Sequence, residues 1–338
     1  QLTPGQLLAG SYLYKPIFEG SSTVTKGGAQ YKTEIYSETR VVKPEQLLEE
    51  NIKRRALVIG SQGQVRTYRG GLFALGDNKV NYIHPEQKIN LANCQGMIVD
   101  APSTTNKDVF YDSLHYLESG RRVLVVLLDG FGFTHYQYCL EHNRLPFLST
   151  IANSSRAVTS FKPVTNTGLA AVLTGQGPEE NGVYSHDQKQ LQVPDLFHKA
   201  AGLGLKSKYI EGNIKILNTS LEPTLNPDFN QNGTTDDEVF ASAKKAANSE
   251  ADLVFVHFHG IDDAGHDYGP RAKSTLEVVE RTDHYLQQLA ADWGGKLIIT
   301  ADHGMHATEN GGDHGAVRYE DMFVPYLITE GGKTNEEK

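Results

Sequence analysis

The sequence has few cysteines and no long apolar run. Only two cysteines, Cys94 and Cys139, occur among 338 residues, and their spacing matches neither a thiolate metal site nor a redox motif. Two buried thiols, or one disulfide in an exported protein, are the alternatives for this pair. No apolar stretch approaches the roughly 18–20 residues of a membrane-spanning helix. We therefore expect no transmembrane segment.

Basic residues are also in the minority. The 32 lysines and arginines are outnumbered by 41 aspartates and glutamates, which gives a net charge of −9. This negative charge argues against nucleic acid as a stable partner and against binding to an anionic membrane. A small phosphorylated substrate stays compatible with it, because bound cations can reverse the local field.

Residues 1–120 differ in pattern from the remainder of the chain. Short segments rich in Tyr, Thr and Val, separated by Gly and Asn, predict strands at 31–36, 56–59, 64–68, 80–83 and 96–100. Helices are expected around 6–8, 44–53 and 108–117. The region shows no catalytic pattern, so we predict a β-rich N-terminal region whose role the sequence leaves open.

From residue 121 onward, apolar strand patterns alternate with helical ones. Strands are expected at 123–128, 157–161, 206–211, 253–258, 296–300 and 322–328, and helices at 134–142, 165–175, 195–202, 235–248 and 274–289. Continuous apolar strands of this kind are typical of a parallel sheet that is buried on both faces. We therefore predict an α/β fold over residues 121–330, with a central, largely parallel sheet flanked by helices. Residues 331–338 are expected to form a frayed tail.

Three of the apolar strands end in residues that can bind metals. These are Asp129 after the first strand, Asp262 and His266 after the second, and Asp302, His303 and the more distant His314 after the third. Because the carboxyl ends of parallel strands share one edge of a sheet, we expect these side chains to converge. Imidazole and carboxylate ligands without thiolates suit Zn²⁺ first, with Mn²⁺, Fe or Co²⁺ as alternatives. There are enough of them for two divalent ions.

A candidate nucleophile follows the short strand at 157–161. The segment Thr165-Asn166-Thr167-Gly168 opens a helix, and a hydroxyl beside helix N-terminal N–H groups suits a phosphate. The alternative is a threonine that only caps the helix. A threonine hydroxyl is a weak nucleophile until a metal or a base lowers its pKa, so this role depends on Asp129 being a metal ligand.

Taken together, these motifs resemble the alkaline phosphatase superfamily. The resemblance is closer to its branch of type I phosphodiesterases, nucleotide pyrophosphatases and phosphonoacetate hydrolase, and it covers about residues 121–330. The matching pieces are Leu128-Asp129-Gly130, Thr165 set nine residues before Thr174-Gly175, Asp262-Asp-Ala-Gly-His266-Asp-Tyr-Gly-Pro270, Asp302-His303-Gly304-Met305 and His314-Gly315.

The resemblance implies a ligand set and a mechanism. One metal would be held by Asp129, Asp302, His303 and the Thr165 oxygen, and the other by Asp262, His266 and His314. Thr165, rather than Thr167, would attack the phosphorus of a small phosphorylated substrate, and water would hydrolyse the phosphothreonine. The implied activity is that of a metal-dependent phosphoester hydrolase, a phosphodiesterase or a phosphomonoesterase.

The chain departs from the branch at one position. Where those enzymes carry an asparagine that holds a phosphoryl oxygen, this sequence has His186, which we take with Asn166 as a candidate substrate contact. The departure leaves the choice between diester and monoester open. A metal-dependent phosphomutase, a phosphonate hydrolase and a non-catalytic metal-binding protein are the alternatives. The start at Gln1 is compatible with a trimmed, exported product, so we expect an extracytoplasmic location over a cytoplasmic one, and the oligomeric state stays open.

Overall fold

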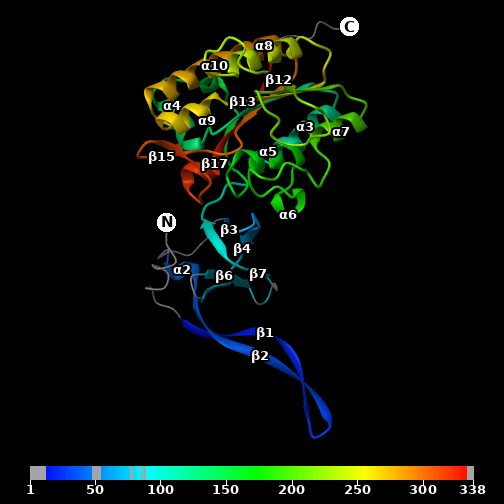
Figure 1. The fold of residues 1–338 in the computed structure, drawn as a ribbon, viewed down its shortest axis with the longest axis vertical. Helices are drawn as coiled ribbons and strands as arrows, with labels where there is room; N and C mark the ends of the chain where they lie inside the picture. Colours follow the sequence, from blue (N-terminus) through cyan, green and yellow to red (C-terminus); the bar gives the residue numbers. More distant parts are fainter. Residues whose placement is uncertain (1–12, 48–54, 77–78, 85, 87–88, 333–338) are drawn as a thin grey trace. The chain divides into compact units, whose positions relative to one another are not determined.

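The computed structural model describes residues 13–47, 55–76, 79–84, 86 and 89–332, whose elements are traced in Figure 1. The chain divides into two compact units, residues 1–101 and residues 102–338. The division thus falls after Ala101 and not after residue 120. The reason is helix α3 (Asp108–Glu118), which packs against strand β9 (Val123–Leu128) and helix α5 (Thr165–Thr174) of the second unit.

The first unit is built from two antiparallel sheets, which confirms the predicted β-rich N-terminal region. Their strand orders are β1-β2-β5-β6-β7 and β4-β3-β8. The bounds are β1 (Leu13–Lys26), β2 (Ala29–Val42), β3 (Ala56–Gly60), β4 (Val65–Tyr68), β5 (Leu72–Gly76), β6 (Lys79–His84), β7 (Ile89–Leu91) and β8 (Cys94–Ile98). Helix α2 (Pro44–Leu47) is the described part of the helix expected at 44–53, and the one expected at 6–8 lies outside the described residues.

A sheet with strand order β10-β17-β14-β9-β13-β11-β12 forms the centre of the second unit. Its other strands are β10 (Ser154–Val158), β11 (Ser207–Glu211), β12 (Thr224–Leu225), β13 (Leu253–Phe258), β14 (Lys296–Thr300) and β17 (Phe323–Glu330). The pairs from β14 to β12 are parallel, and only β17 runs against its two neighbours in this sheet of the described chain. The predicted α/β fold with a largely parallel central sheet is therefore confirmed.

Helices cover both faces of this sheet, with α8 and α10 on one face and α3, α5 and α7 on the other (Figure 1). The remaining elements are α4 (Phe133–Glu141), a 3-10 turn (Leu148–Thr150), α6 (Pro178–Asn181), α7 (Leu196–Gly202), α8 (Asp236–Ala247), α9 (Gly260–Tyr268), α10 (Lys273–Asp292), α11 (Tyr319–Met322), β15 (His306–Thr308) and β16 (Gly311–Asp313). All six residues of β9 and all six of β13 are buried, as their continuous apolar character predicts. No helix in the described ranges has both the length and the apolar character needed to cross a membrane.

Two local predictions need correction. The strand expected at 157–161 is Ser154–Val158, because its pairing with β17 begins three residues earlier. The tail expected to fray from residue 331 is held at its start, since the backbone N–H groups of Gly331 and Gly332 donate to the carbonyl oxygens of Gly295 and Ala290 at 2.8 and 2.7 Å. Residues 333–338 lie outside the described part of the chain.

Candidate functional site

The candidate site lies where three parallel strands end together. Val123 of β9 pairs with Leu253 of β13 and with Lys296 of β14, so the three strands finish at the same edge of the sheet. The residues that follow are thereby gathered at this edge: Asp129 after β9, Asp262 and His266 on helix α9 after β13, and Asp302 and His303 after β14. Asp262 and His266 are four residues apart on α9, which places them on one face of the helix.

His314 lies at the end of the short β15–β16 hairpin. Strand β16 packs so closely on α9 that a Cβ atom at Gly311 would overlap the backbone oxygen of His266. His314 follows this strand directly, and its ring lies 5.0 Å from the ring of His266 and 3.9 Å from that of His303, measured between centroids. The glycine therefore allows the approach that completes the cluster.

The first predicted group of ligands is assembled around His303. Its Nε2 atom lies 3.2 Å from Asp129 Oδ1, 3.6 Å from Asp302 Oδ2 and 3.4 Å from Thr165 Oγ1. The other oxygen of Asp302, Oδ1, accepts hydrogen bonds from the backbone N–H of Gly130 at 3.3 Å and of His303 at 2.9 Å. These bonds fix the carboxylate and leave Oδ2 directed at the cluster.

The second predicted group is assembled around Asp262. His266 Nε2 lies 3.3 Å from Asp262 Oδ2, and His314 Nε2 lies 3.8 Å from Asp262 Oδ1. The two groups adjoin each other, because ligand atoms of Asp129, Asp262 and His303 all lie within 4.8 Å of one another.

The three imidazoles share one tautomer. Each Nδ1 atom lies 3.0 Å from a backbone oxygen, with His266 facing Gly312, His303 facing Gly304 and His314 facing Pro163. A carbonyl only accepts hydrogen bonds, so Nδ1 is the donor in each ring and Nε2 carries the lone pair in the neutral form. This is the arrangement in which proteins hold a metal-ligating histidine.

Three carboxylate oxygens of the cluster lack a hydrogen-bond donor. Asp129 Oδ1, Asp262 Oδ1 and Asp302 Oδ2 are buried and have no hydrogen-bond donor. Leaving such oxygens unpaired is costly, and a lone pair that faces another lone pair is repulsive unless a cation lies between them. The donor set therefore fits divalent metal ions.

The ionisation of these groups is coupled. Burial opposes the ionisation of Asp129, but its contacts with the imidazoles of His257, His259 and His303 hold its pKa well below the usual range. Burial and the charge of Asp129 raise the pKa of Asp302 to about 7. Burial alone would lower the pKa of His303, yet Asp302 and Asp129 raise it to about 10. Protons thus compete with metal ions for the same lone pairs.

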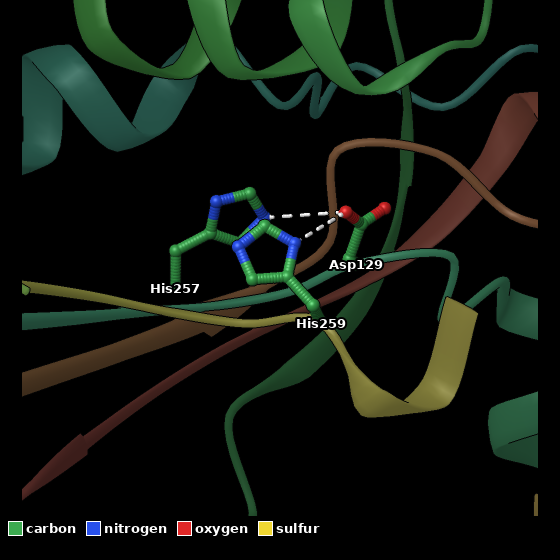
Figure 2. Close-up of side chains that lie close together, drawn as sticks. All are labelled: Asp129, His257 and His259. Atoms are coloured by element: carbon green, nitrogen blue, oxygen red, sulfur yellow. Dashed lines mark hydrogen bonds and ion pairs between the residues drawn. The ribbon is translucent and has the colours of Figure 1, made fainter. Parts of the chain in front are cut away.

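Two histidines outside the predicted ligand set also contact Asp129. His259 Nδ1 lies 3.1 Å, and His257 Nε2 3.6 Å, from Asp129 Oδ2 (Figure 2). The available signal was their position, since His257 is the one polar residue of β13 and His259 directly follows the strand. An imidazole inside an otherwise apolar, buried strand is an unusual pattern for a core.

The predicted substrate contacts lie beside the cluster. The ring of His186 is 6.1 Å from that of His314. Asn166 is buried, and its amide donates to the backbone oxygens of His186 and Gln188 at 3.2 and 3.0 Å. Its side chain thus holds the loop that carries His186. A direct contact of either residue with substrate stays a prediction.

The comparisons with known proteins identify the family of this chain. A sequence profile of the family described as type I phosphodiesterase / nucleotide pyrophosphatase matches residues 123–201 and 191–331. A segment of 108 residues, 28% of this chain, is 33% identical to GPI ethanolamine phosphate transferase 1 of Aspergillus oryzae, but it spans only 10% of that protein.

Two solved structures align with about half of the chain. Phosphonoacetate hydrolase from Sinorhizobium meliloti 1021, in complex with phosphonoformate, superimposes with a TM-score of 0.45 at 19% identity over 55% of this chain and 57% of its own. Murine ectonucleotide pyrophosphatase / phosphodiesterase 5 gives 0.45 at 21% identity over 56% and 59%. The chain thus spans less than two thirds of the length of each of these relatives.

Proposed function

Because the chain belongs to the type I phosphodiesterase / nucleotide pyrophosphatase family, we propose that it is a metal-dependent phosphoester hydrolase that acts through Thr165. The observation that supports this most is the meeting of a threonine hydroxyl with two adjoining groups of carboxylates and imidazoles at one sheet edge. Outside such a site, this concentration of buried, unpaired carboxylate oxygens has no stabilising role.

Two divalent ions would be held by the residues described above. Asp129, Asp302, His303 and the Thr165 oxygen would bind the first, and Asp262, His266 and His314 the second, with Zn²⁺ as the first candidate and Mn²⁺ as an alternative. Bound there, the ions supply positive charge to the phosphoryl oxygens and lower the pKa of a nearby hydroxyl or water.

The chain itself positions the nucleophile and the phosphate. Thr165 is the first residue of the ten-residue helix α5, and Val164 before it has extended backbone angles. The first N–H groups of a helix have no intrahelical acceptor, so they can donate to phosphoryl oxygens beside the Thr165 hydroxyl. The bond between Thr165 Oγ1 and phosphorus forms as the bond from phosphorus to the leaving alcohol breaks. Water then cleaves the bond between Thr165 Oγ1 and phosphorus, which restores the hydroxyl and releases a phosphomonoester from a diester substrate or phosphate from a monoester substrate.

The class of ester is the finer part of the proposal. We take a small phosphodiester as the first candidate, with a phosphomonoester or a phosphonate as alternatives. The Aspergillus relative is named as a transferase, so a second alcohol could replace water as the acceptor. A phosphomutase would instead return the phosphate to the same molecule.

A paired assay tests these outcomes. Bis-p-nitrophenyl phosphate, the p-nitrophenyl ester of thymidine monophosphate and p-nitrophenyl phosphate are each offered to the Zn²⁺-loaded and the Mn²⁺-loaded protein. We expect p-nitrophenol release from at least one of them and loss of that release in Thr165→Ala. An inert wild-type protein with full metal content would overturn the proposal, and ethanolamine added as acceptor distinguishes transfer from hydrolysis through its phosphorylated product.

A further inference from the structure

The carboxylate of Asp129 faces two different sets of nitrogens. Its Oδ1 atom points to His303, as described above, while Oδ2 points to His257 and His259. These two imidazoles approach each other with ring centroids 4.0 Å apart (Figure 2). In the proposed two-ion mechanism, Oδ1 is a metal ligand, and the contacts of Oδ2 with His257 and His259 have no role.

Glu211 determines which nitrogens of this pair carry hydrogen. Its carboxylate is fully buried and lies 3.1 Å from His257 Nδ1 and 2.5 Å from His259 Nε2. Since burial is outweighed by the attraction of both imidazoles, the pKa of Glu211 is lowered, and the ionised group accepts from both rings. In the neutral rings, the remaining lone pairs are on His257 Nε2 and His259 Nδ1, the two atoms directed at Asp129.

His257 supplies a second, independent observation. It is fully buried, and its Nε2 atom has no hydrogen-bond partner. A buried acceptor without a donor is rare in native proteins, and an absent ion is one of its recognised explanations. A carboxylate that accepts from the far side of a ligating imidazole is also the usual support of a metal site.

We propose that Asp129, His257 and His259 form a third metal site, in which Asp129 bridges to the first of the two sites above. Donor atoms about 2.0–2.1 Å from a tetrahedral Zn²⁺ lie about 3.3 Å from one another. The separations of 3.1 and 3.6 Å from Asp129 Oδ2 lie on either side of this value. Two imidazoles and one carboxylate select a divalent transition ion, such as Zn²⁺ or Co²⁺, over Mg²⁺ or Ca²⁺.

Of the three proposed ligands, His259 borders a cavity of about 300 Å³, together with Thr235 and Asp263. We expect an ion to enter the site past His259 from this cavity. Such an ion would fix Asp129 and reduce its negative charge. It would support the proposed function, on which this inference rests, and would take no part in the attack on phosphorus.

Two substitutions remove a ligand atom and keep the bond to Glu211. In His259→Gln, the amide nitrogen can still donate to Glu211 in place of Nε2, while the Nδ1 ligand is lost. In His257→Asn, the amide can replace Nδ1 as donor, while the Nε2 ligand is lost. His198→Gln, which removes an exposed imidazole of α7, is the matched control.

Metal content is measured after reconstitution of the metal-free full chain with Zn²⁺ and removal of unbound ion. We expect three ions per chain in the wild type and in the control, and two in each of the other variants. A Co²⁺ titration of Glu211→Gln should show one of three binding steps weakened 10–100-fold, which tests the site even if a histidine variant fails to fold.

Two ions per chain in the wild type, with no loss in either histidine variant, would overturn the third site. The two imidazoles would then hold protons, consistent with a His257 pKa that burial lowers but Glu211 raises to about 9. This outcome is independent of the proposed function. If the protein binds two ions and cleaves esters, the hydrolase proposal stands and the third site is refuted. If it binds three ions and cleaves no ester, the third site stands and the hydrolase proposal is refuted.

Discussion

Thr165 Oγ1 lies 3.4 Å from His303 Nε2, although 138 residues separate the two in the sequence. The contact joins the first turn of α5 to the end of β14, so the helix that presents the hydroxyl and the strand that presents a metal ligand are held as one unit. The predictions on Thr165 and on Gly168 depend on this relationship.

Thr165→Ala should abolish turnover and leave the protein folded. A side chain that forms a covalent bond with the substrate cannot be replaced by a methyl group, so we expect kcat to fall by about a thousandfold or more. The second group of ligands is untouched, and its ion should stay bound. Steady-state kinetics, with metal analysis on the same sample, measures both effects.

Thr167→Val is the matched control for this substitution. Thr167 lies two residues further along α5, is fully buried, and its Oγ1 has no hydrogen-bond partner. Valine has nearly the same shape, so activity and thermal stability should stay close to those of the wild type. If Thr167→Val were inactive and Thr165→Ala active, the assignment of the nucleophile would be reversed.

Removal of metal should cost both activity and stability. Without cations, the unpaired oxygens of Asp129, Asp262 and Asp302 face one another inside the protein. An ion held at a hundred times its Kd adds about 2.7 kcal/mol to the free energy of unfolding. EDTA should therefore lower the melting temperature by several degrees, and Zn²⁺ should restore it. EDTA presaturated with Ca²⁺ is the control, and unchanged activity after full chelation would contradict the metal assignment.

The close contact between α5 and Asp302, which follows β14, gives a third prediction. A Cβ atom at Gly168 would overlap the backbone oxygen of Asp302, so Gly168→Ala must push the helix and this segment apart. Overpacking of this kind costs about 1–3 kcal/mol, and it should also separate Thr165 from His303. We expect a lower melting temperature and a large loss of kcat.

Gly202→Ala tests whether the effect is specific. Gly202 ends helix α7, and a Cβ atom there would meet nothing within 4 Å. Alanine favours a helix by up to about 1 kcal/mol relative to glycine, so stability should be unchanged or slightly higher. Equal damage from the two substitutions would show that the contact with Asp302 is not the cause.

The strand ends were predictable because their signal is local. Six apolar residues followed by Asp129 require only the rule that parallel strands share a ligand-binding edge. The contact between Glu211 and His257 is of a different kind, since it spans 46 residues and exists only because β11 pairs in parallel with β13. Nothing in either segment alone indicates that their side chains will meet.

The boundary between the two units also depends on contacts that the local sequence does not indicate. The helix expected at 108–117, which the structure shows as Asp108–Glu118, is predictable from its own residues, but its assignment to the second unit depends on the faces of β9 and α5 that it covers. Sequence periodicity shows that a helix has an apolar face, not which partner that face will meet.

The cysteines allow a prediction about reactivity. Both are free thiols, and burial is the main cause that raises the pKa of Cys94 to about 11 and of Cys139 to about 12. At pH 8 only about a thousandth of Cys94, and less of Cys139, is the reactive thiolate. Iodoacetamide should therefore label the native protein slowly, and faster as the pH rises toward 11. If two thiols are labelled rapidly in the protein unfolded by guanidinium chloride, both cysteines are free. If no thiol is labelled, the two cysteines form a disulfide.

His186 offers the sharpest test of substrate class. Burial, together with the charges of His303 and Lys162, lowers its pKa, so its imidazole is neutral at pH 7 and can donate a hydrogen bond without adding charge. A neutral donor suits the single negative charge of a phosphodiester, whereas a charged one would favour the dianion of a monoester. We expect His186→Ala to lower kcat/KM by about 100–1000-fold, in line with the loss of one oxyanion donor. His186→Asn, which restores an amide donor, should recover most of this loss and keep the ratio of diester to monoester cleavage. His142→Ala, at the exposed end of α4, is the control. If the asparagine variant were as slow as the alanine variant, His186 would not be a phosphoryl donor, and the preference for diesters would need another source.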